Sequence, residues 1–355
     1  MKVVSVVGAR PQFVKAFPVS NELREDHEEV LVHTGQHYDR ELSGIFFEEL
    51  RMPTPEYNLG VGSDTPGAQV AEMIRSLEPV LREEAPDVVV VYGDTNSTLS
   101  AAIAATKADP LLAHVEAGLR SDNREMPEET NRVLTDHASD LLFAPTRRAV
   151  ENLSREGLDD RASWTGDVMY DALRAVKPVA LETSTIRSDL SLEDPYVLAT
   201  VHRAGNTDDP DRLGRIVDAL VSLPEPVVFP IHPRTVSALE GLGELDRLRE
   251  AVELLDPVGY FDFVALLDGA RRLVTDSGGA QKEAFLLDTP CVTLRAETEW
   301  TETVDAGWNV LVDADPERIR AAVRRDFDPG EKPLPYGDGN AAAAIRRQLV
   351  DAVSR

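Results

Sequence analysis

Short apolar runs along this chain alternate with longer stretches that are apolar on one face only. The run that begins at Asp87 continues as Val-Val-Val-Val-Tyr, and a strand with no polar position is typical of a parallel sheet covered on both faces. Stretches such as Pro210–Ser222 show helical periodicity. This alternation predicts doubly wound α/β domains. The predicted strands are Lys2–Val7, Glu29–His33, Asp87–Tyr92, Leu111–Val115, Leu141–Pro145, Tyr196–Thr200, Val227–Ile231, Val252–Leu255, Arg272–Thr275 and Cys291–Leu294.

The strands fall into two series, which predicts two domains. The chain has 355 residues, about twice a typical domain of ~100–200 residues. The break is expected within Val168–Asp194, where a helix over Tyr170–Lys177 precedes a loop with few apolar residues. We therefore expect domains over residues 1–170 and 171–339. A helix is expected over Asn340–Val353, after an irregular stretch rich in proline and glycine.

Composition narrows the class of protein. Hydrophobic residues make up 42 % of the chain, but no apolar run approaches the ~18 residues of a membrane span, and we find no secretion signal, so a cytoplasmic protein is expected. The formal charge of −26 argues against nucleic acid or an acidic membrane as a partner, and an acidic surface of this kind is typical of salt-adapted proteins. The lone cysteine, Cys291, excludes an internal disulfide and is expected to be a buried apolar residue.

Candidate chemistry is sought after each strand, because open α/β sheets bind ligands beyond the carboxyl ends of their strands. Gly8-Ala9-Arg10-Pro11 follows the first strand, and with Lys15 it forms either a phosphate site at a helix start or an ordinary turn with two surface cations. Asp94 follows the strand that ends at Tyr92, as a catalytic carboxylate or as a helix cap.

A third strand end has several charged residues. Glu116 comes directly after Val115, and Arg120 four residues later makes a structural ion pair one interpretation. The catalytic interpretation requires Glu116 to converge with Asp94 and with Glu128 or Glu129, which is possible because neighbouring parallel strands end at one edge.

In the second half of the chain, two histidines follow strands, each next to an arginine. His202 precedes Arg203, and His232 lies two residues before Arg234, which suggests an anion-binding mouth. No HEXXH or CXXC spacing is present, so a metal is the weaker interpretation.

The most informative segment is Thr275-Asp276-Ser277-Gly278-Gly279, where an apolar strand meets a helix. Glycines let a pyrophosphate approach the backbone, and a helix start provides N–H donors. Glu283, one to two turns into that helix, is placed to accept the hydroxyls of a ribose. The alternative is a tight strand–helix turn. Arg295-Ala296-Glu297-Thr298-Glu299-Trp300 follows the next strand.

Together these segments resemble the family of non-hydrolysing UDP-N-acetylglucosamine 2-epimerases. The likeness extends over nearly the whole chain, in order, through the motifs GARPQFVK, TGQHYD, VYGDTNSTL, HVEAGLRS, MPEETNR, ATVHRAGN, PIHPRT, TDSGGAQKEA and LRAETEWTETV.

The resemblance implies two Rossmann-like domains facing a cleft, as in glycosyltransferase-B folds, with the last helix, residues 340–355, packed back on the first domain. It implies a UDP-sugar substrate. No cofactor or metal is expected, because the turn after the first strand lacks GXGXXG and no metal-ligand spacing is present, and a homodimer is expected. By the same resemblance, a second UDP-sugar binds as an activator near Gln36 and His37 in bacterial members. The UDP contacts match Arg10, His202, Phe263, Ser277, Gly278, Gly279 and Glu283, and the catalytic site matches Lys15, Asp94, Glu116, Glu128, Arg132 and His202.

Three departures from the commoner family pattern leave the sugar open. Gly205 stands where many members have glutamate, Lys282 stands within a common QEE, and Trp300 replaces the arginine of TERPE. The implied reaction is inversion at carbon 2 of UDP-N-acetylglucosamine, giving UDP-N-acetylmannosamine, by elimination and re-addition of UDP. Alternatives are a 2-epimerase of UDP-2,3-diacetamido-2,3-dideoxy-glucuronate, a hydrolysing epimerase, a glycosyltransferase and a non-catalytic nucleotide-sugar-binding protein.

Overall fold

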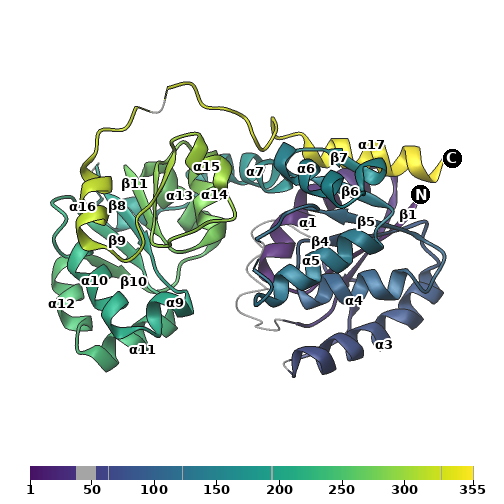
Figure 1. Ribbon diagram of the computed structural model, residues 1–355, viewed down its shortest axis with the longest axis horizontal. Coiled ribbons are helices and arrows are strands. Elements are labelled where there is room, and N and C mark those ends of the chain that lie inside the picture. The colour runs from purple at the N-terminus through teal and green to yellow at the C-terminus, as the bar shows by residue number, and fades with distance from the viewer. Residues whose placement is uncertain (37–52, 63, 122, 193–194, 329, 355) are drawn as a thin grey trace. The chain divides into compact units, whose positions relative to one another are not determined.

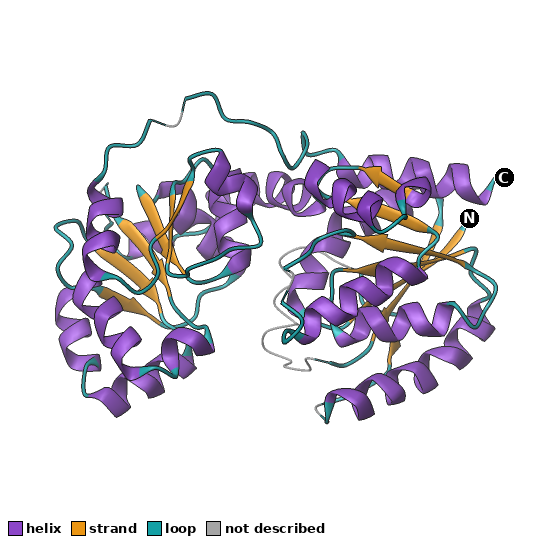
Figure 2. Cartoon of the chain, viewed as in Figure 1, coloured by secondary structure: helices purple, strands orange, loops and turns teal. Residues whose placement is uncertain are grey.

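The chain folds into two units of parallel sheet and helix, shown in Figures 1 and 2. The structure is a computed structural model that describes residues 1–36, 53–62, 64–121, 123–192, 195–328 and 330–354. Met1–Arg174 and Leu334–Arg355 form unit 1, and Ala175–Pro333 forms unit 2. The division falls inside helix α7 (Val168–Thr183), four residues after the boundary expected from the sequence.

Within the described residues, unit 1 contains a seven-stranded parallel sheet in the order β3-β2-β1-β4-β5-β6-β7. Its strands are β1 (Lys2–Val7), β2 (Glu28–His33), β3 (Tyr57–Asn58), β4 (Val88–Tyr92), β5 (Leu111–Val115), β6 (Leu141–Ala144) and β7 (Ala162–Trp164). Its helices are α1 (Arg10–Asp26), α3 (Pro66–Glu84), α4 (Asn96–Ala105), α5 (Pro127–Ala138), α6 (Arg147–Arg155), the start of α7 and α17 (Ala341–Val353), with a 3-10 turn at Asp159–Arg161.

Unit 2 contains a six-stranded parallel sheet in the order β10-β9-β8-β11-β12-β13, again counted over the described part of the chain. Its strands are β8 (Val197–Thr200), β9 (Val227–Pro230), β10 (Glu253–Leu255), β11 (Arg272–Thr275), β12 (Cys291–Thr293) and β13 (Asn309–Leu311). Its helices are the end of α7, α8 (Ile186–Asp189), α9 (Ala204–Thr207), α10 (Pro210–Leu220), α11 (Pro233–Leu242), α12 (Leu245–Ala251), α13 (Tyr260–Gly269), α14 (Gly278–Leu286), α15 (Thr301–Asp305) and α16 (Pro316–Arg324).

Both sheets have the Rossmann strand order, which confirms the predicted fold class. Every residue of β4 is buried, as expected for a strand between two helical layers. The order reverses between β1 and β4 in unit 1 and between β8 and β11 in unit 2. Ligands of such sheets bind beyond the carboxyl ends of the strands at these reversals, which is where the candidate residues follow their strands.

The C-terminal helix is part of unit 1. Figure 1 shows α17, in yellow, in the same unit as the N-terminus. Arg346 of α17 pairs with Glu22 at 3.3 Å and with Asp26 at 3.1 Å, both on α1. Asp171 of α7 accepts the N–H of Ala342 at 2.9 Å, near the start of α17. These contacts join segments more than 150 residues apart into one unit.

All ten predicted strands are present, with ends that differ by a residue at most. Three short strands at the sheet edges, β3, β7 and β13, were not predicted, whereas β10 and β12, which are also three residues long, were. Helix α1 begins at Arg10, with Pro11 in its first turn.

Candidate functional site

The first candidate set lies at the carboxyl edge of the unit 1 sheet. Lys15 of α1 forms an ion pair with Glu116, which follows β5, and the two residues are only 9 % and 7 % exposed. Gly93 lies beside this pair: a Cβ there would be 3.0 Å from Lys15 Nζ and 3.5 Å from Glu116 Oε2. A side chain at position 93 would therefore press on the ion pair, and its φ of 63° also favours glycine.

Glu116 itself has a left-handed backbone, with φ of 72°. This conformation costs a residue other than glycine about 1–3 kcal/mol, and it is common at functional sites. The expected alternative, an ion pair between Glu116 and Arg120, is wrong. Arg120 instead pairs with Asp136 and Glu156, each at 2.7 Å.

Asp94 lies next to Gly93 and pairs with Arg132 of α5. The helix-cap interpretation of Asp94 is wrong, because the N-cap of α4 is Thr95, whose hydroxyl accepts the N–H of Thr98. The side chain of Asn131 donates to the Asp94 carbonyl at 3.0 Å and further anchors the turn.

The two adjacent glutamates of α5 differ in environment. Glu129 is buried, lies 3.3 Å from Arg132 and accepts hydrogen bonds from the N–H and hydroxyl of Ser121 at 3.0 and 2.8 Å. Glu128 is the second residue of α5 and is exposed. At the carboxyl edge of unit 1, two ion-paired groups are therefore formed by Lys15, Asp94, Glu116, Glu129 and Arg132. Glu128 is exposed beside Glu129 in the first turn of α5 and belongs to neither group.

The turn before α1 uses two of its backbone N–H groups within the protein, and the phosphate interpretation of this turn stays a prediction. The side chain of Gln12 accepts the N–H groups of Gly8 and Ala9 at 2.8 and 3.0 Å. These two donors are therefore occupied within the chain. Arg10 is the first residue of α1, and its side chain lies outside the described part of the structure.

Of the possible effector residues, Gln36 is described and His37 is not. The side-chain oxygen of Gln36 accepts from the N–H and hydroxyl of Ser97 at 3.0 and 2.6 Å. Because Ser97 is in the first turn of α4, Gln36 lies at the same edge of the sheet as Asp94.

The second candidate set lies at the carboxyl edge of the unit 2 sheet. Asp276, fully buried after β11, accepts the N–H groups of His202 at 3.1 Å and Arg203 at 3.0 Å, and the side chain of Asn206 at 3.0 Å. The sequence interpretation did not single out Asp276, although a carboxylate at a strand end is the signal used for Asp94 and Glu116. Asp276 fixes the loop after β8 against the start of α14.

The predicted meeting of the two histidines is found. The rings of His202 and His232 are 6.1 Å apart. Partial dehydration lowers the pKa of His202, an effect that Asp276 opposes and that the nearby His232 and Arg203 reinforce. Of the two arginines expected at the anion-binding mouth, Arg234 pairs with Asp208 at 2.6 Å, so a carboxylate balances its charge.

The Ser-Gly-Gly turn opens a nine-residue helix, α14, as predicted. Ser277 is its N-cap and accepts the N–H of Ala280. A Cβ at Gly278 would overlap the carboxylate of Glu299, whereas a Cβ at Gly279 meets nothing within 4 Å. Burial tends to raise the pKa of Glu299, but Arg295 and Arg203 outweigh it and lower that pKa, so a carboxylate lies against Gly278.

Glu283 of α14 is buried and accepts a hydrogen bond from the hydroxyl of Tyr260 at 3.0 Å. Tyr260 begins α13, and Phe263 follows it on the same helix, three residues later and half-buried. Residues three apart lie on one helix face, so α13 brings Phe263 toward the same part of unit 2 as Glu283. Tyr260 was missed from the sequence because it belongs to no polar motif.

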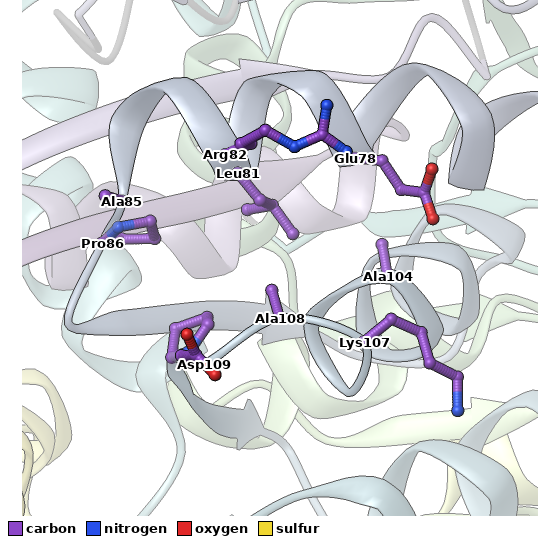
Figure 3. A pocket seen from close by; sticks show the side chains of 10 residues that line it. Glu78, Leu81, Arg82, Ala85, Pro86, Ala104, Lys107, Ala108 and Asp109 are labelled. Carbon is purple, nitrogen blue, oxygen red and sulfur yellow. The ribbon is translucent and has the colours of Figure 1, made fainter.

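Other features do not add to the candidate sites. A pocket of 370 Å³ lies at the opposite edge of the unit 1 sheet, where Pro86 and Pro110 precede β4 and β5, and Figure 3 shows charges of both signs around it. Burial raises the pKa of the Cys291 thiol to about 12. Among the described residues, no cluster of three or more His, Cys, Asp or Glu side chains is arranged to hold a metal. The described helices also include none that is long and apolar enough to cross a membrane.

Two Rossmann-type sheets, one edged by ion-paired carboxylates and the other by a Ser-Gly-Gly helix start, define a two-domain protein of the nucleotide-binding α/β class. Residues 21–350 match the sequence profile of the family described as UDP-N-acetylglucosamine 2-epimerase. The chain belongs to this family, and the protein is therefore an isomerase, a UDP-sugar 2-epimerase.

Individual relatives differ in the sugar that their names give. A UDP-N-acetylglucosamine 2-epimerase homolog from Methanococcus maripaludis is 48 % identical over 97 % of this chain and 98 % of its own. The UDP-2,3-diacetamido-2,3-dideoxy-D-glucuronate 2-epimerase of Pseudomonas aeruginosa is 46 % identical, over 98 % of this chain and 99 % of its own. A crystal structure of Methanocaldococcus jannaschii UDP-GlcNAc 2-epimerase in complex with UDP-GlcNAc and UDP is 41 % identical and superposes with a TM-score of 0.89, covering 99 % of this chain and 100 % of that chain.

Proposed function

We propose that this protein interconverts UDP-N-acetylglucosamine and UDP-N-acetylmannosamine by inverting carbon 2 of the sugar. The observation that most supports this is the pair of carboxylates at one sheet edge, Glu116 held by Lys15 and Asp94 held by Arg132. Inversion at carbon 2 requires proton transfer on both faces of the sugar, and this in turn requires more than one acid/base group.

The chemistry follows from the lack of a carbonyl next to carbon 2, which makes direct removal of its proton unfavourable. A carboxylate takes the C2 proton, the C–H electron pair forms the C1=C2 double bond, and the C1–O bond breaks with its pair leaving on UDP. A proton then arrives at carbon 2 from the other face, and UDP re-adds at carbon 1. Asp94, Glu116 and Glu128 are our candidates for these proton transfers.

The unit 2 residues are proposed to hold the UDP moiety. The helix start at Ser277–Gly279 offers N–H donors to the diphosphate, and His202 is beside it on the loop that Asp276 anchors. Glu283 would accept ribose hydroxyls, and Phe263 would contact the uracil. Arg10, Lys15 and Arg132 are proposed to stabilise negative charge on the departing UDP and on the carboxylates.

The test is incubation with UDP-N-acetylglucosamine in D2O at high salt, followed by NMR of the products. We expect UDP-N-acetylmannosamine with deuterium at carbon 2 and no net release of UDP at equilibrium. We also expect the rate to survive dialysis against a chelator without added nicotinamide. Product without solvent deuterium would contradict the elimination mechanism, and stoichiometric free UDP and sugar would indicate a hydrolysing epimerase.

A second candidate substrate is UDP-2,3-diacetamido-2,3-dideoxy-glucuronate. The Pseudomonas relative named for this sugar is 46 % identical to this chain, more than the 41 % of the M. jannaschii UDP-GlcNAc 2-epimerase. In addition, a Cβ at Gly205 would meet nothing within 4 Å, so the glutamate common in relatives is replaced by open space. A site without that carboxylate would repel an acidic sugar less.

Parallel rates on both UDP-sugars decide between the two substrates. Gly205→Glu should lower the rate on the acidic sugar more than on UDP-N-acetylglucosamine, and Gly205→Gln, which adds similar volume without charge, is the control. If Gly205→Glu leaves the ratio of the two rates unchanged, position 205 does not determine the sugar.

A further inference from the structure

A buried hydrogen-bonded chain joins the two turns that contain Asp94 and Glu116. His114 Nδ1 is 2.7 Å from Asp136 Oδ1, and His114 Nε2 is 2.7 Å from the carbonyl oxygen of Gly93. The other oxygen of Asp136 accepts the N–H of Gly118 at 3.1 Å. This series of hydrogen bonds therefore connects Gly93, the residue before Asp94, with Gly118, the second residue after Glu116. Both His114 and Asp136 are 0 % exposed.

The hydrogen-bond partners of His114 indicate which of its ring nitrogens donate. Burial tends to raise the pKa of Asp136, but His114 and Arg120 outweigh it and lower that pKa, so Asp136 is a carboxylate. A carboxylate and a carbonyl only accept hydrogen bonds, so both ring nitrogens of His114 are donors.

Arg120 also holds Asp136 in place through an ion pair. Arg120 Nη1 donates to Asp136 at 2.7 Å, and its Nε and Nη2 bind both carboxylate oxygens of Glu156 at 2.7 Å. Arg120 thus pairs with the charges of both Asp136 and Glu156. A buried carboxylate that is fully hydrogen-bonded holds its partners rigidly, because each broken bond would leave a buried polar group unsatisfied.

The turn at Glu116 needs such support, because its left-handed backbone persists only where surrounding contacts determine it. The N–H groups of Glu116 and Ala117 both donate to the Phe143 carbonyl at 3.1 Å, and Asp136 holds the next N–H, that of Gly118. Three successive N–H groups are therefore fixed, and the third depends on a side chain outside the motif that contains Glu116.

We propose that His114 and Asp136 are positioning residues, which set the spacing of Asp94 and Glu116 by linking Gly93 to Gly118. This inference rests on the proposed function, in which those two carboxylates transfer protons at carbon 2. Misplacing an acid/base group by about 1 Å can lower a rate by about 100-fold. We therefore expect the His114–Asp136 link to affect turnover, although neither residue is a candidate contact of the nucleotide.

Three variants test the link. Asp136→Asn keeps the side-chain shape but replaces one accepting oxygen with an amide donor, and so disrupts the contact with His114 or the contacts with Gly118 and Arg120. His114→Asn can place an amide nitrogen near Nδ1 and keep the bond to Asp136, whereas His114→Gln can place one near Nε2 and keep the bond to Gly93. The matched control is His137→Gln, since His137 adjoins Asp136 on α5 and is also hydrogen-bonded, to Glu156 at 3.1 Å, but its side chain is 47 % exposed.

The measurements are kcat and KM on the active UDP-sugar, the Kd of UDP by calorimetry, and the thermal midpoint. We expect Asp136→Asn to lower kcat by about 10- to 100-fold with KM and the UDP Kd within about twofold. Each His114 variant should lose less, because each keeps one of the two bonds. His137→Gln should match the wild type.

Wild-type kcat in all three variants would overturn the proposal, and so would a loss of kcat that is matched by equal losses in UDP affinity. If Asp136→Asn does not fold, the two His114 variants decide by the same criteria. Histidine ¹⁵N NMR gives a readout that does not need activity: both His114 nitrogens should be protonated, and an unprotonated nitrogen would contradict the assignment. If the wild type inverts no UDP-sugar, the proposed function fails instead, with the NMR result unaffected.

Discussion

The side-chain nitrogen of Lys282 lies 4.1 Å from the centre of the Trp300 indole ring, and both residues are buried. These are two of the three positions at which the sequence departs from the commoner family pattern. Lys282 is on α14, behind the Ser-Gly-Gly turn, and Trp300 precedes α15. The two departures therefore meet in space, as a cation above an aromatic face, a contact of up to about 2 kcal/mol when desolvated.

This contact predicts that the two positions change together. Lys282→Glu alone should destabilise unit 2, because it places a carboxylate against the indole face, and Trp300→Arg alone should do so by bringing two cations together. The double variant restores opposite charges and should be more stable than the sum of the single effects predicts. Urea unfolding of the four proteins measures the coupling, and additive single effects would show that the positions are independent.

Replacing Glu116 alone should lower both turnover and stability, and the double variant described below should separate the two effects. Glu116→Gln should lower turnover by about 10²–10⁴-fold, as expected for loss of a general acid or base. It should also lower the thermal midpoint, because a buried cation loses its partner. UDP affinity should be nearly unchanged, since Glu116 is not a candidate UDP contact and these contacts, apart from Arg10, belong to unit 2.

The control for this prediction is the double variant Lys15→Met with Glu116→Gln. Removing both charges should recover much of the stability but none of the turnover. If Glu116→Gln keeps a near-normal rate and loses only stability, the ion pair is structural.

The neighbouring glutamates of α5 should respond in opposite ways to the same substitution. Glu129→Gln should lower the free energy of unfolding by about 1.5–3 kcal/mol, because a buried charged acceptor of Arg132 is lost. Glu128→Gln should leave that free energy unchanged, since the side chain is exposed, and should lower turnover if Glu128 acts on the substrate. Chemical unfolding and initial rates measured side by side distinguish the two roles; equal stability losses would contradict the difference in environment.

The adjacent glycines at the start of α14 offer a matched comparison. Gly278→Ala should lower stability slightly, by about 1 kcal/mol, because the new methyl group displaces the Glu299 carboxylate, the end of a flexible side chain, from its place beside Arg295. Gly279→Ala should fold as the wild type does, since space surrounds that position, but should weaken UDP binding if the diphosphate approaches there. Combining Gly278→Ala with Glu299→Ala should recover stability. Calorimetry with UDP and thermal melts test both parts, and unchanged UDP affinity in Gly279→Ala would place the diphosphate elsewhere.

The lowered pKa of His202 predicts a pH dependence of substrate binding. A diphosphate beside the ring would raise that pKa again, so binding takes up a proton and the affinity for UDP-N-acetylglucosamine should rise as the pH falls from about 8 to about 5.5. The same lowering means that the unfolded chain takes up the proton first, so His202 lowers stability as the pH falls through 6.5.

Calorimetry across this range tests the pH prediction. His202→Asn should bind more weakly and lose most of the slope, whereas His232→Asn should keep it. A slope that is the same in wild type and His202→Asn would assign the proton to another group, with Asp276, His232 and Arg203 as the charged neighbours to examine.

Much of the fold was determined by local pattern. The run Val88–Tyr92 predicts a buried parallel strand from its own residues, and Ser277-Gly278-Gly279 predicts a helix start because the cap and the open backbone are encoded within four positions. Strand β13, at the edge of its sheet, was not predicted, because its order depends on pairing with β12, a contact that its own residues do not encode.

The candidate site was determined partly by local sequence pattern and partly by tertiary contacts. Which residue types lie at the strand ends was determined by the sequence, since parallel strands of one sheet place their carboxyl ends together. The ion-pair partners of these residues were not determined by the sequence. Spacing favoured Arg120 for Glu116, yet the partner is Lys15, 101 positions away in the numbering, and Arg120 is paired with Glu156 instead.

Long-range ion pairs of this kind depend on which helices the sheet order brings to one edge, and no local period encodes that. The same reason applies to Tyr260 beside Glu283 and to His114 between Gly93 and Asp136. The sequence alone determined the elements, the family and the chemical groups available at each strand end. Only the tertiary structure decided which charges are neutralised and which turns are tied together, because those contacts form between segments that become neighbours only after the sheets assemble.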